Sequence, residues 1–217
     1  MRTYFDDQLN QLNREMIQMG SMIEQAIERV CDVLRIHDVE AAKAIVRGDS
    51  EIDRKERDIE ALCLRLILMQ QPVASDLRMV SSALKMITDM ERIGDQASDI
   101  AEIISMPIEE EIVEKPAHLL TMGESAAHMV HKAVDAYVSR DLSLAQEVIE
   151  SDDIVDNLFI QVKEEIQEQI RTSEDPGMQL LDTLMIAKYF ERIADHAVNI
   201  AEWVEYAVTG IYKGEAL

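Results

Sequence analysis

Two segments of this chain, one hundred residues apart, carry the same pattern of acidic side chains. Residues 91–102 have the sequence ERIGDQASDIAE, and residues 191–202 have the sequence ERIADHAVNIAE. On an α-helix that turns about 100° per residue, the first, fifth, ninth and twelfth positions of each copy fall within one quadrant, opposite an aliphatic stripe. Each copy therefore predicts a row of oxygen ligands along one helix face. The rows consist of Glu91, Asp95, Asp99 and Glu102, and of Glu191, Asp195, Asn199 and Glu202.

An earlier segment of each half adds further carboxylates. Asp49 and Asp53 lie four residues apart, which is one helical turn, and Asp152 and Asp156 repeat that spacing in the second half. If each of these segments is an antiparallel neighbour of the helix that carries the acidic row, the two sets of carboxylates converge. The sequence therefore predicts one acidic site in each half of the chain.

Cation binding is the chemistry that such rows favour. Like charges one turn apart destabilise a helix by a few tenths of a kcal/mol per pair, and a bound cation removes that repulsion. Oxygen ligands without cysteine suit hard cations such as Mg, Ca, Mn or ferric iron, and several adjacent carboxylates favour a multinuclear cluster. His196, beside the second row, would add a nitrogen ligand and admit Zn or ferrous iron. The simpler alternative is a solvated acidic face that binds no metal.

Other candidate sites are weaker. His128 and His131 share a helix face with Glu124, but the first half has no counterpart, so surface residues are the favoured interpretation. The sequence contains no glycine-rich phosphate loop and no G-x-S-x-G nucleophile motif. It therefore predicts a protein that is not an enzyme, with a multinuclear metal phosphohydrolase as the less favoured alternative.

The elements that would position these residues are long helices. Apolar residues recur at helical spacing over residues 3–36, 39–69, 73–105, 117–139, 141–172 and 177–209, with Asp38 as an expected N-cap. Few aromatic residues and few glycines also favour helices. The predicted fold class is all-α, with two tandem three-helix bundles related by an internal pseudo-twofold repeat. The expected division is a first bundle over residues 1–106, a linker over 107–116 and a second bundle over 117–217.

Charge and composition exclude several classes of partner. The formal net charge is −22, so direct binding to nucleic acid or to anionic lipid is not expected. Cys31 and Cys63 lie within apolar helical patterns, which indicates buried thiols in a reducing compartment. The N-terminus lacks the apolar run of a signal peptide, and no stretch approaches the about 20 apolar residues of a membrane span. We expect a cytoplasmic protein without membrane insertion.

These segments resemble the PhoU family of accessory regulators of bacterial phosphate-specific transport. The resemblance rests on both acidic copies, on residues 71–78 (QPVASDLR), on the Met19-Gly20 pair and on the segment from Gly48-Asp49 to Asp53. It implies two three-helix bundles, a cytoplasmic location, homodimers and metal clusters on the acidic motifs of some members. It also implies a negative regulator of the phosphate-starvation response that links the ATPase subunit of the phosphate ABC transporter to a sensor histidine kinase.

The two copies differ at positions that bear on this resemblance. Gly94 is replaced by Ala194 in the second copy, and Asp99 is replaced by Asn199. The second difference removes a charge, so we expect the two sites to differ in metal content. A helical scaffold whose acidic surface binds a basic partner without metal is the remaining alternative.

Overall fold

The chain is described here by a computed structural model, in which residues 2–70, 72, 75–106, 115–172 and 177–216 are described. Within these residues it forms six long helices, as the periodicity of apolar residues predicts. The helices begin and end within two residues of the expected positions, except that residues 73–74, the expected start of the third helix, lie outside the described residues. The helices are α1 Arg2–Ile36, α2 Val39–Gln70, α3 Ser75–Ser105, α4 Ala117–Ser139, α5 Leu142–Thr172 and α6 Gln179–Thr209.

The first helix corner of each half is built in the same way. His37 and Arg140 both have φ of 55°, the left-handed conformation in which many helices end. The next residue caps the following helix. The Asp38 Oδ1 atom accepts a hydrogen bond from the N–H of Ala41 (3.0 Å), and Asp141 Oδ1 accepts one from the N–H two residues further on (2.8 Å). The predicted N-cap is confirmed, and the corners support the internal repeat.

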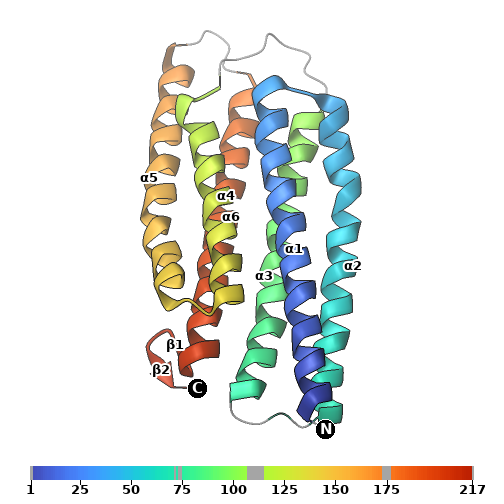
Figure 1. Ribbon diagram of the computed structural model, residues 1–217. Helices are drawn as coiled ribbons and strands as arrows, with labels where there is room; N and C mark the ends of the chain where they lie inside the picture. Colours follow the sequence, from blue (N-terminus) through green and yellow to red (C-terminus); the bar gives the residue numbers. More distant parts are fainter. Residues whose placement is uncertain (1, 71, 73–74, 107–114, 173–176, 217) are drawn as a thin grey trace.

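The two halves are three-helix bundles that lie side by side (Figure 1). The helix pairs α1 with α4 and α3 with α6 join the halves, and the members of each pair run in opposite directions, as a pseudo-twofold axis requires. One cluster of buried aliphatic, alanine and methionine side chains runs through both halves. The predicted fold class is therefore confirmed. The linker stays a prediction, because residues 107–114 lie outside the described residues.

Two glycines let α1 and α4 pack closely. A Cβ atom on Gly20 would lie 2.7 Å from Val134 Cγ1, and one on Gly123 would lie 2.9 Å from Cys31 Sγ and 2.7 Å from Phe190 Cζ. All three distances are too short for real contacts. Cys31 and Val134 occupy equivalent positions in the two halves, so the repeated Met-Gly pair marks a close contact that the pseudo-twofold axis duplicates.

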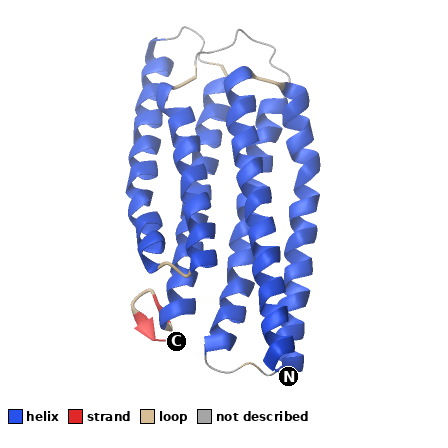
Figure 2. Cartoon of the chain, viewed as in Figure 1, coloured by secondary structure: helices blue, strands red, loops and turns tan. Residues whose placement is uncertain are grey.

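A short hairpin, which no sequence pattern predicts, follows α6 (Figure 2). Strand β1 (Ile211–Tyr212) pairs with β2 (Glu215–Ala216) in antiparallel fashion. The turn between them has positive φ at both central residues, 49° at Lys213 and 83° at Gly214. Such turns match the twist of a two-residue hairpin but favour Asn-Gly or Gly-Gly, so Lys-Gly is a weak sequence signal.

Two further expectations concern the cysteines and the membrane. Cys31 and Cys63 are free and buried, as predicted, and burial raises the pKa of each thiol to about 12. Among the described residues, no helix combines the length and the apolar character that crossing a bilayer demands.

Candidate metal centre

Three carboxylates from two helices meet in the first half. Because α2 and α3 are antiparallel neighbours, Asp49 and Asp53 of α2 lie opposite Asp95 of α3. One oxygen from each of these half-buried side chains lies within 4.8 Å of the others. In the part of the chain that the structure describes, this is the one group of three or more His, Cys, Asp or Glu residues with that spacing. We call these residues, together with Glu91, the first acidic site.

Asp49 is the member of the first acidic site whose environment favours a cation most clearly. Its Oδ1 atom is buried and accepts no hydrogen bond from the described residues. Burial, followed by the charges of Asp95 and Asp53, raises the pKa of Asp49 to about 6. A buried acceptor without a donor is costly, and a hard cation would satisfy it. The residues present therefore fit a metal with oxygen ligands.

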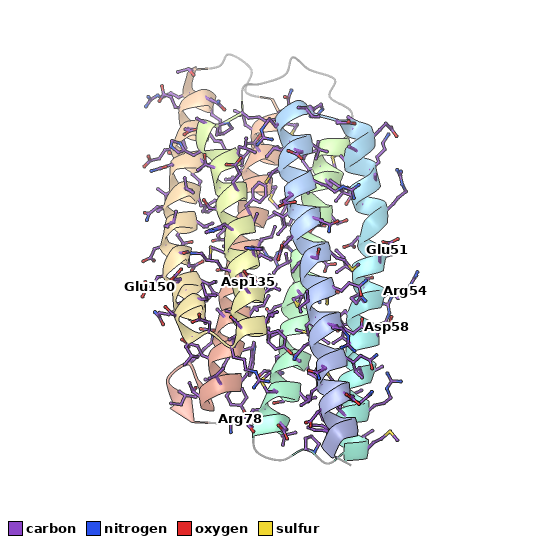
Figure 3. The ribbon with its side chains drawn as sticks, in the orientation of Figure 1. Glu51, Arg54, Asp58, Arg78, Asp135 and Glu150 are labelled. Atoms are coloured by element: carbon purple, nitrogen blue, oxygen red, sulfur yellow. The ribbon has the colours of Figure 1, made fainter. Side chains whose placement is uncertain are left out.

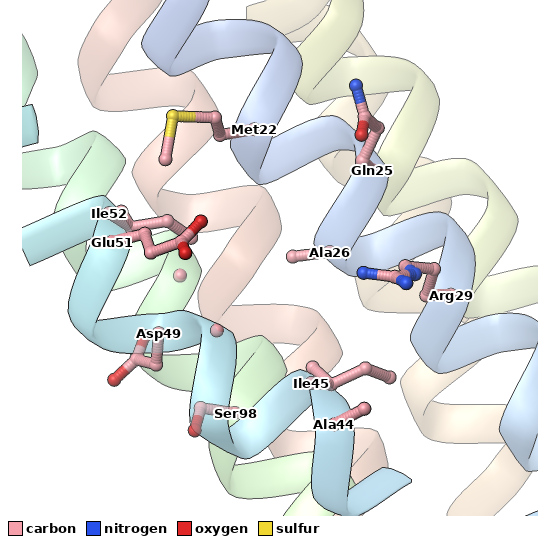
Figure 4. Close-up of a pocket in the computed structure, with 12 residues that line it drawn as sticks. Met22, Gln25, Ala26, Arg29, Ala44, Ile45, Asp49, Glu51, Ile52 and Ser98 are labelled. Carbon is pink, nitrogen blue, oxygen red and sulfur yellow. The ribbon is translucent and has the colours of Figure 1, made fainter. Parts of the chain in front are cut away.

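The burial of Asp49 has a structural cause. Asp49 forms part of the wall of a small cavity between α1, α2 and α3, of about 120 Å³ (Figure 4). The rest of the wall mixes apolar side chains, such as Met22, Ile45 and Ile52, with the polar side chains of Gln25, Arg29, Glu51 and Ser98. Packing between these three helices removes Asp49 from water, and the neighbouring aspartates add their negative charge.

Arg92 supplies partial charge compensation at the edge of the first acidic site. Its guanidinium lies 2.9 Å from Asp95 Oδ2 and 3.4 Å from Glu91 Oε2, and its side chain is 53% exposed. Burial and the charge of Asp95 still raise the pKa of Glu91. Arg92 thus forms ion pairs with Glu91 and Asp95, but Asp49 and Asp53 have no basic partner among the described residues.

The second half repeats the arrangement with more positive charge nearby. Burial, followed by Asp156 and Asp195, raises the pKa of Asp152 to about 6, and burial and Glu191 raise the pKa of Asp195. We call Asp152, Asp156, Asp195 and Glu191 the second acidic site. Its described side chains do not bring three ligand atoms within 4.8 Å of one another.

Lys188 accounts for part of this difference between the sites. Its ammonium group contacts Glu191, and it also lies 5.6 Å from the centre of the Phe159 ring. Lys163 lies 5.5 Å from the same ring. In the first half, Glu56 and Glu60 stand at the positions of Phe159 and Lys163, so the acidic row of α2 continues where that of α5 ends.

The ninth position of each acidic copy has its hydrogen-bond partner in the other half of the chain. Asn199 Nδ2 donates a hydrogen bond to Asp89 Oδ1 (3.1 Å), and His196 Nδ1 lies 2.8 Å from the same oxygen. The Tyr189 hydroxyl donates to the Asp99 carboxylate. Asp89 and Tyr189 are equivalent positions, so the loss of charge at Asn199 is matched by a gain of charge at Asp89. No local pattern in the sequence predicts either partner, because the paired residues lie 110 and 90 positions apart.

Asp99 stays within electrostatic reach of the first acidic site. Burial and the charge of Asp95 raise its pKa, and the hydrogen bond from Tyr189 opposes that shift. Asp99 therefore both neighbours the first acidic site and forms a contact between α3 and α6.

The last position of each copy differs most between the halves. Glu102 is exposed, whereas Glu202 is 16% exposed and forms an ion pair with Lys213 of the hairpin (2.8 Å). Lys213 also lines an open cavity of about 510 Å³ together with Asp152 and Asp195. No local pattern in the sequence predicts this position of Lys213.

His131 and Glu124 of α4 form contacts between the halves. His131 lies 3.1 Å from Glu24 of α1 and 3.4 Å from Asp135, while Glu124 pairs with Arg35 of α1 at 3.0 Å. These ion pairs support the interpretation of His131 and Glu124 as surface residues.

Comparison with known proteins identifies the family. The PhoU domain model matches residues 16–104 and 119–204, once in each half. The phosphate-specific transport system accessory protein PhoU homolog of Clostridium acetobutylicum is 37% identical over 210 residues, which is 96% of each chain. The homolog from Aquifex aeolicus is 36% identical and covers 85% of this chain and 84% of its own.

Solved structures agree with the sequence comparison. The crystal structure of PhoU from Pseudomonas aeruginosa has a TM-score of 0.90 and 31% identity, and the match covers 95% of this chain and 99% of that one. The phosphate transport system regulatory protein PhoU from Streptococcus pneumoniae gives 0.88 and 28%, with 98% and 99% coverage. The doubled helical bundle, the two acidic copies and these matches over nearly the whole chain lead to one conclusion: the chain belongs to the PhoU family.

Proposed function

We propose that this protein is an accessory regulator of phosphate uptake that holds metal cations at its acidic sites. The observation that carries the metal proposal is the meeting of Asp49, Asp53 and Asp95, with a buried Asp49 oxygen that lacks a donor. Glu91 and Asp99 would complete the first set of ligands. Asp152, Asp156, Asp195 and Glu191 would form a second and weaker site, with Asn199, Glu202 and Glu102 at the margins of the two rows.

The ligand set restricts the metal. Carboxylate oxygens suit Mg, Ca, Mn or ferric iron, and His196 near the second acidic site would allow Zn or ferrous iron there. A bound metal would neutralise the clustered carboxylates and would offer open coordination positions to an oxyanion such as phosphate. The protein residues hold α2 against α3 in the register that brings the carboxylates together.

The regulatory role would be carried out by contact with partners and without catalysis. We propose that a cytoplasmic homodimer binds the ATPase subunit of the phosphate ABC transporter and a sensor histidine kinase, and acts as a negative regulator of the phosphate-starvation response. The names of the relatives, as accessory proteins of phosphate-specific transport, support the first partner. Acidic residues such as Glu51, Asp58 and Glu150, exposed on α2 and α5, suit a basic protein surface (Figure 3).

Elemental analysis and calorimetric titration test the metal sites. We expect metal in protein purified under metal-replete conditions, a lower metal content in Asp95→Ala and Asp195→Ala, and none in the double variant. Asp58→Ala is the matched control, because Asp58 is an exposed carboxylate of α2 outside both sites. Metal-free wild-type protein would contradict the proposal.

Titration of this protein with the transporter ATPase subunit tests whether the two proteins bind each other. If the metal sites shape the binding surface, a chelator weakens the complex and Asp95→Ala does the same. Binding that is indifferent to chelator and weakens steeply with salt would favour the scaffold that acts without metal.

A further inference from the structure

The C-terminal hairpin carries a cation to the edge of the second acidic site. Lys213, at the tip of the hairpin, forms an ion pair with Glu202 (2.8 Å) and lines the same open cavity as Asp152 and Asp195. Within the described residues, no lysine makes the equivalent contact with Glu102.

The backbone and the aromatic residues show that this placement is specific. Lys213 adopts φ of 49°, a left-handed conformation that costs a residue with a side chain about 1 kcal/mol and that favours Gly or Asn in this turn. Tyr212 stacks on Trp203 of α6 with ring centres 4.1 Å apart, and Tyr206 packs edge-on against Trp203. The stacking fixes the hairpin on α6 at the height of Glu202. A lysine is therefore held in an unfavourable conformation at the position where it reaches the acidic row.

We propose that the hairpin is an intramolecular latch, in which Lys213 acts as a tethered cation that competes with metal at the second acidic site. This inference rests on the proposed metal binding of the two sites. A tethered ammonium group replaces part of the charge that a metal ion would supply, so a metal that binds there must displace Lys213 or tolerate its repulsion. By thermodynamic linkage, a partner that pulls the hairpin away from α6 would raise the metal affinity of the second site and leave the first site unchanged.

Calorimetric titration with Mn²⁺ tests the latch in variants that retain one site each. In the Asp95→Ala background, Lys213→Ala is expected to lower the Kd of the remaining site by about two- to fivefold, which is the usual range for one partly exposed charge. Tyr212→Ala should act in the same direction, because it removes the stacking that holds the hairpin. Tyr212→Phe keeps the stacked ring and should leave the Kd unchanged.

Two controls separate the latch from a general effect of charge. In the Asp195→Ala background, Lys213→Ala should not change the Kd of the first site. Lys132→Ala, which breaks the 2.9 Å ion pair with Glu147 on α4 and α5, should not change the Kd of either site. An unchanged Kd of the second site in Lys213→Ala, alongside normal Mn²⁺ binding at the first site, would overturn the latch. Absence of Mn²⁺ binding at both sites would instead overturn the proposed metal function.

Discussion

Asp49 is expected to make the stability of the metal-free protein depend on pH. Its pKa in the folded protein is about 6, above the ordinary value of 3.8, because burial and neighbouring aspartates disfavour the charged form. A carboxyl with a raised pKa stabilises the fold at pH below its ordinary value, and this contribution is lost as the pH rises through about 6. The metal-free protein should therefore lose stability between pH 5 and pH 7.5.

Asp49→Asn tests this dependence by replacing the carboxylate with a neutral group of the same shape. The loss of unfolding free energy between pH 5 and pH 7.5 should be smaller in Asp49→Asn than in the wild type. The difference should be about 1 kcal/mol after allowance for solvent screening, which corresponds to about 2–4 °C in Tm. Thermal unfolding in the presence of chelator at both pH values measures it. The exposed control Asp58→Asn should behave as wild type, and an equal loss in Asp49→Asn and wild type would contradict the prediction.

The contact between Asn199 and Asp89 gives a second prediction at the scale of one residue. Asn199→Asp would place a carboxylate against the Asp89 Oδ1 atom, which now accepts the amide hydrogen bond at 3.1 Å. We expect a loss of about 1–2 kcal/mol in urea unfolding at pH 7.5 with chelator. Asp99→Asn should cost less than 1 kcal/mol, because an amide oxygen still accepts the hydrogen bond from Tyr189.

The double variant Asp89→Asn/Asn199→Asp tests whether the charge is the cause. It restores one amide and one carboxylate with their positions exchanged, so most of the lost stability should return. A double variant as unstable as Asn199→Asp alone would show that the cost arises elsewhere.

At the scale of the helices, the sequence predicts much of the structure because its signals are local. The apolar periodicity and Asp38 define the helices, and the spacing of Asp49 and Asp53 indicates that their carboxylates meet the row of α3. Contacts between the halves are different in kind. The partners of Asn199 and Asp99, and the position of Lys213 beside Glu202, depend on how α3, α6 and the hairpin pack, which no local pattern encodes.

Position 94 shows how packing between helices also explains a difference between the copies. A Cβ atom on Gly94 would lie 3.0 Å from Ile52 Cδ1, which leaves little space for a methyl group. In the second half Ala194 stands in place of Gly94, and Val155 stands in place of the larger Ile52. Both Ala194 and Val155 are fully buried. The two substitutions nearly conserve volume, which is the kind of change that cores tolerate best.

The contact between α1 and α4 leads to a prediction at the same scale. Gly20→Ala would bring a methyl group to 2.7 Å from Val134 Cγ1, so the two helices must separate or Val134 must move. We expect a loss of about 1–3 kcal/mol in urea unfolding. Gly48→Ala is the matched control, because it also replaces a glycine inside a helix, here α2. A Cβ atom on Gly48 meets no atom within 4 Å. Adding Val134→Ala to Gly20→Ala should recover part of the loss, and no recovery would contradict a steric cause.

At the scale of the whole molecule, the backbone is nearly symmetric and the charge is not. The first acidic site has Arg92 at its edge, whereas the second row meets Lys188 at one end and Lys213 near the other. The pseudo-twofold axis therefore relates two acidic sites on equivalent helices that differ in their neighbouring positive charges. Under the proposed metal binding, the duplicated fold would hold one strong and one adjustable cation site.

The shared core predicts that the two halves unfold as one unit. Buried side chains from all six helices described here form a single cluster, and α3 and α6 are packed against each other across the centre. Trp203 on α6 is the one tryptophan of the chain, so its fluorescence reports on the second half, while circular dichroism reports on every helix. Ile59→Ala removes a fully buried side chain of α2 and should cost about 2–5 kcal/mol. In urea, this change in the first half should shift the fluorescence and circular dichroism midpoints equally, whereas the exposed control Asp58→Ala should shift neither. If the Trp203 transition stayed at the wild-type midpoint while circular dichroism separated into two steps, the halves would be independent domains and the shared core would not couple them.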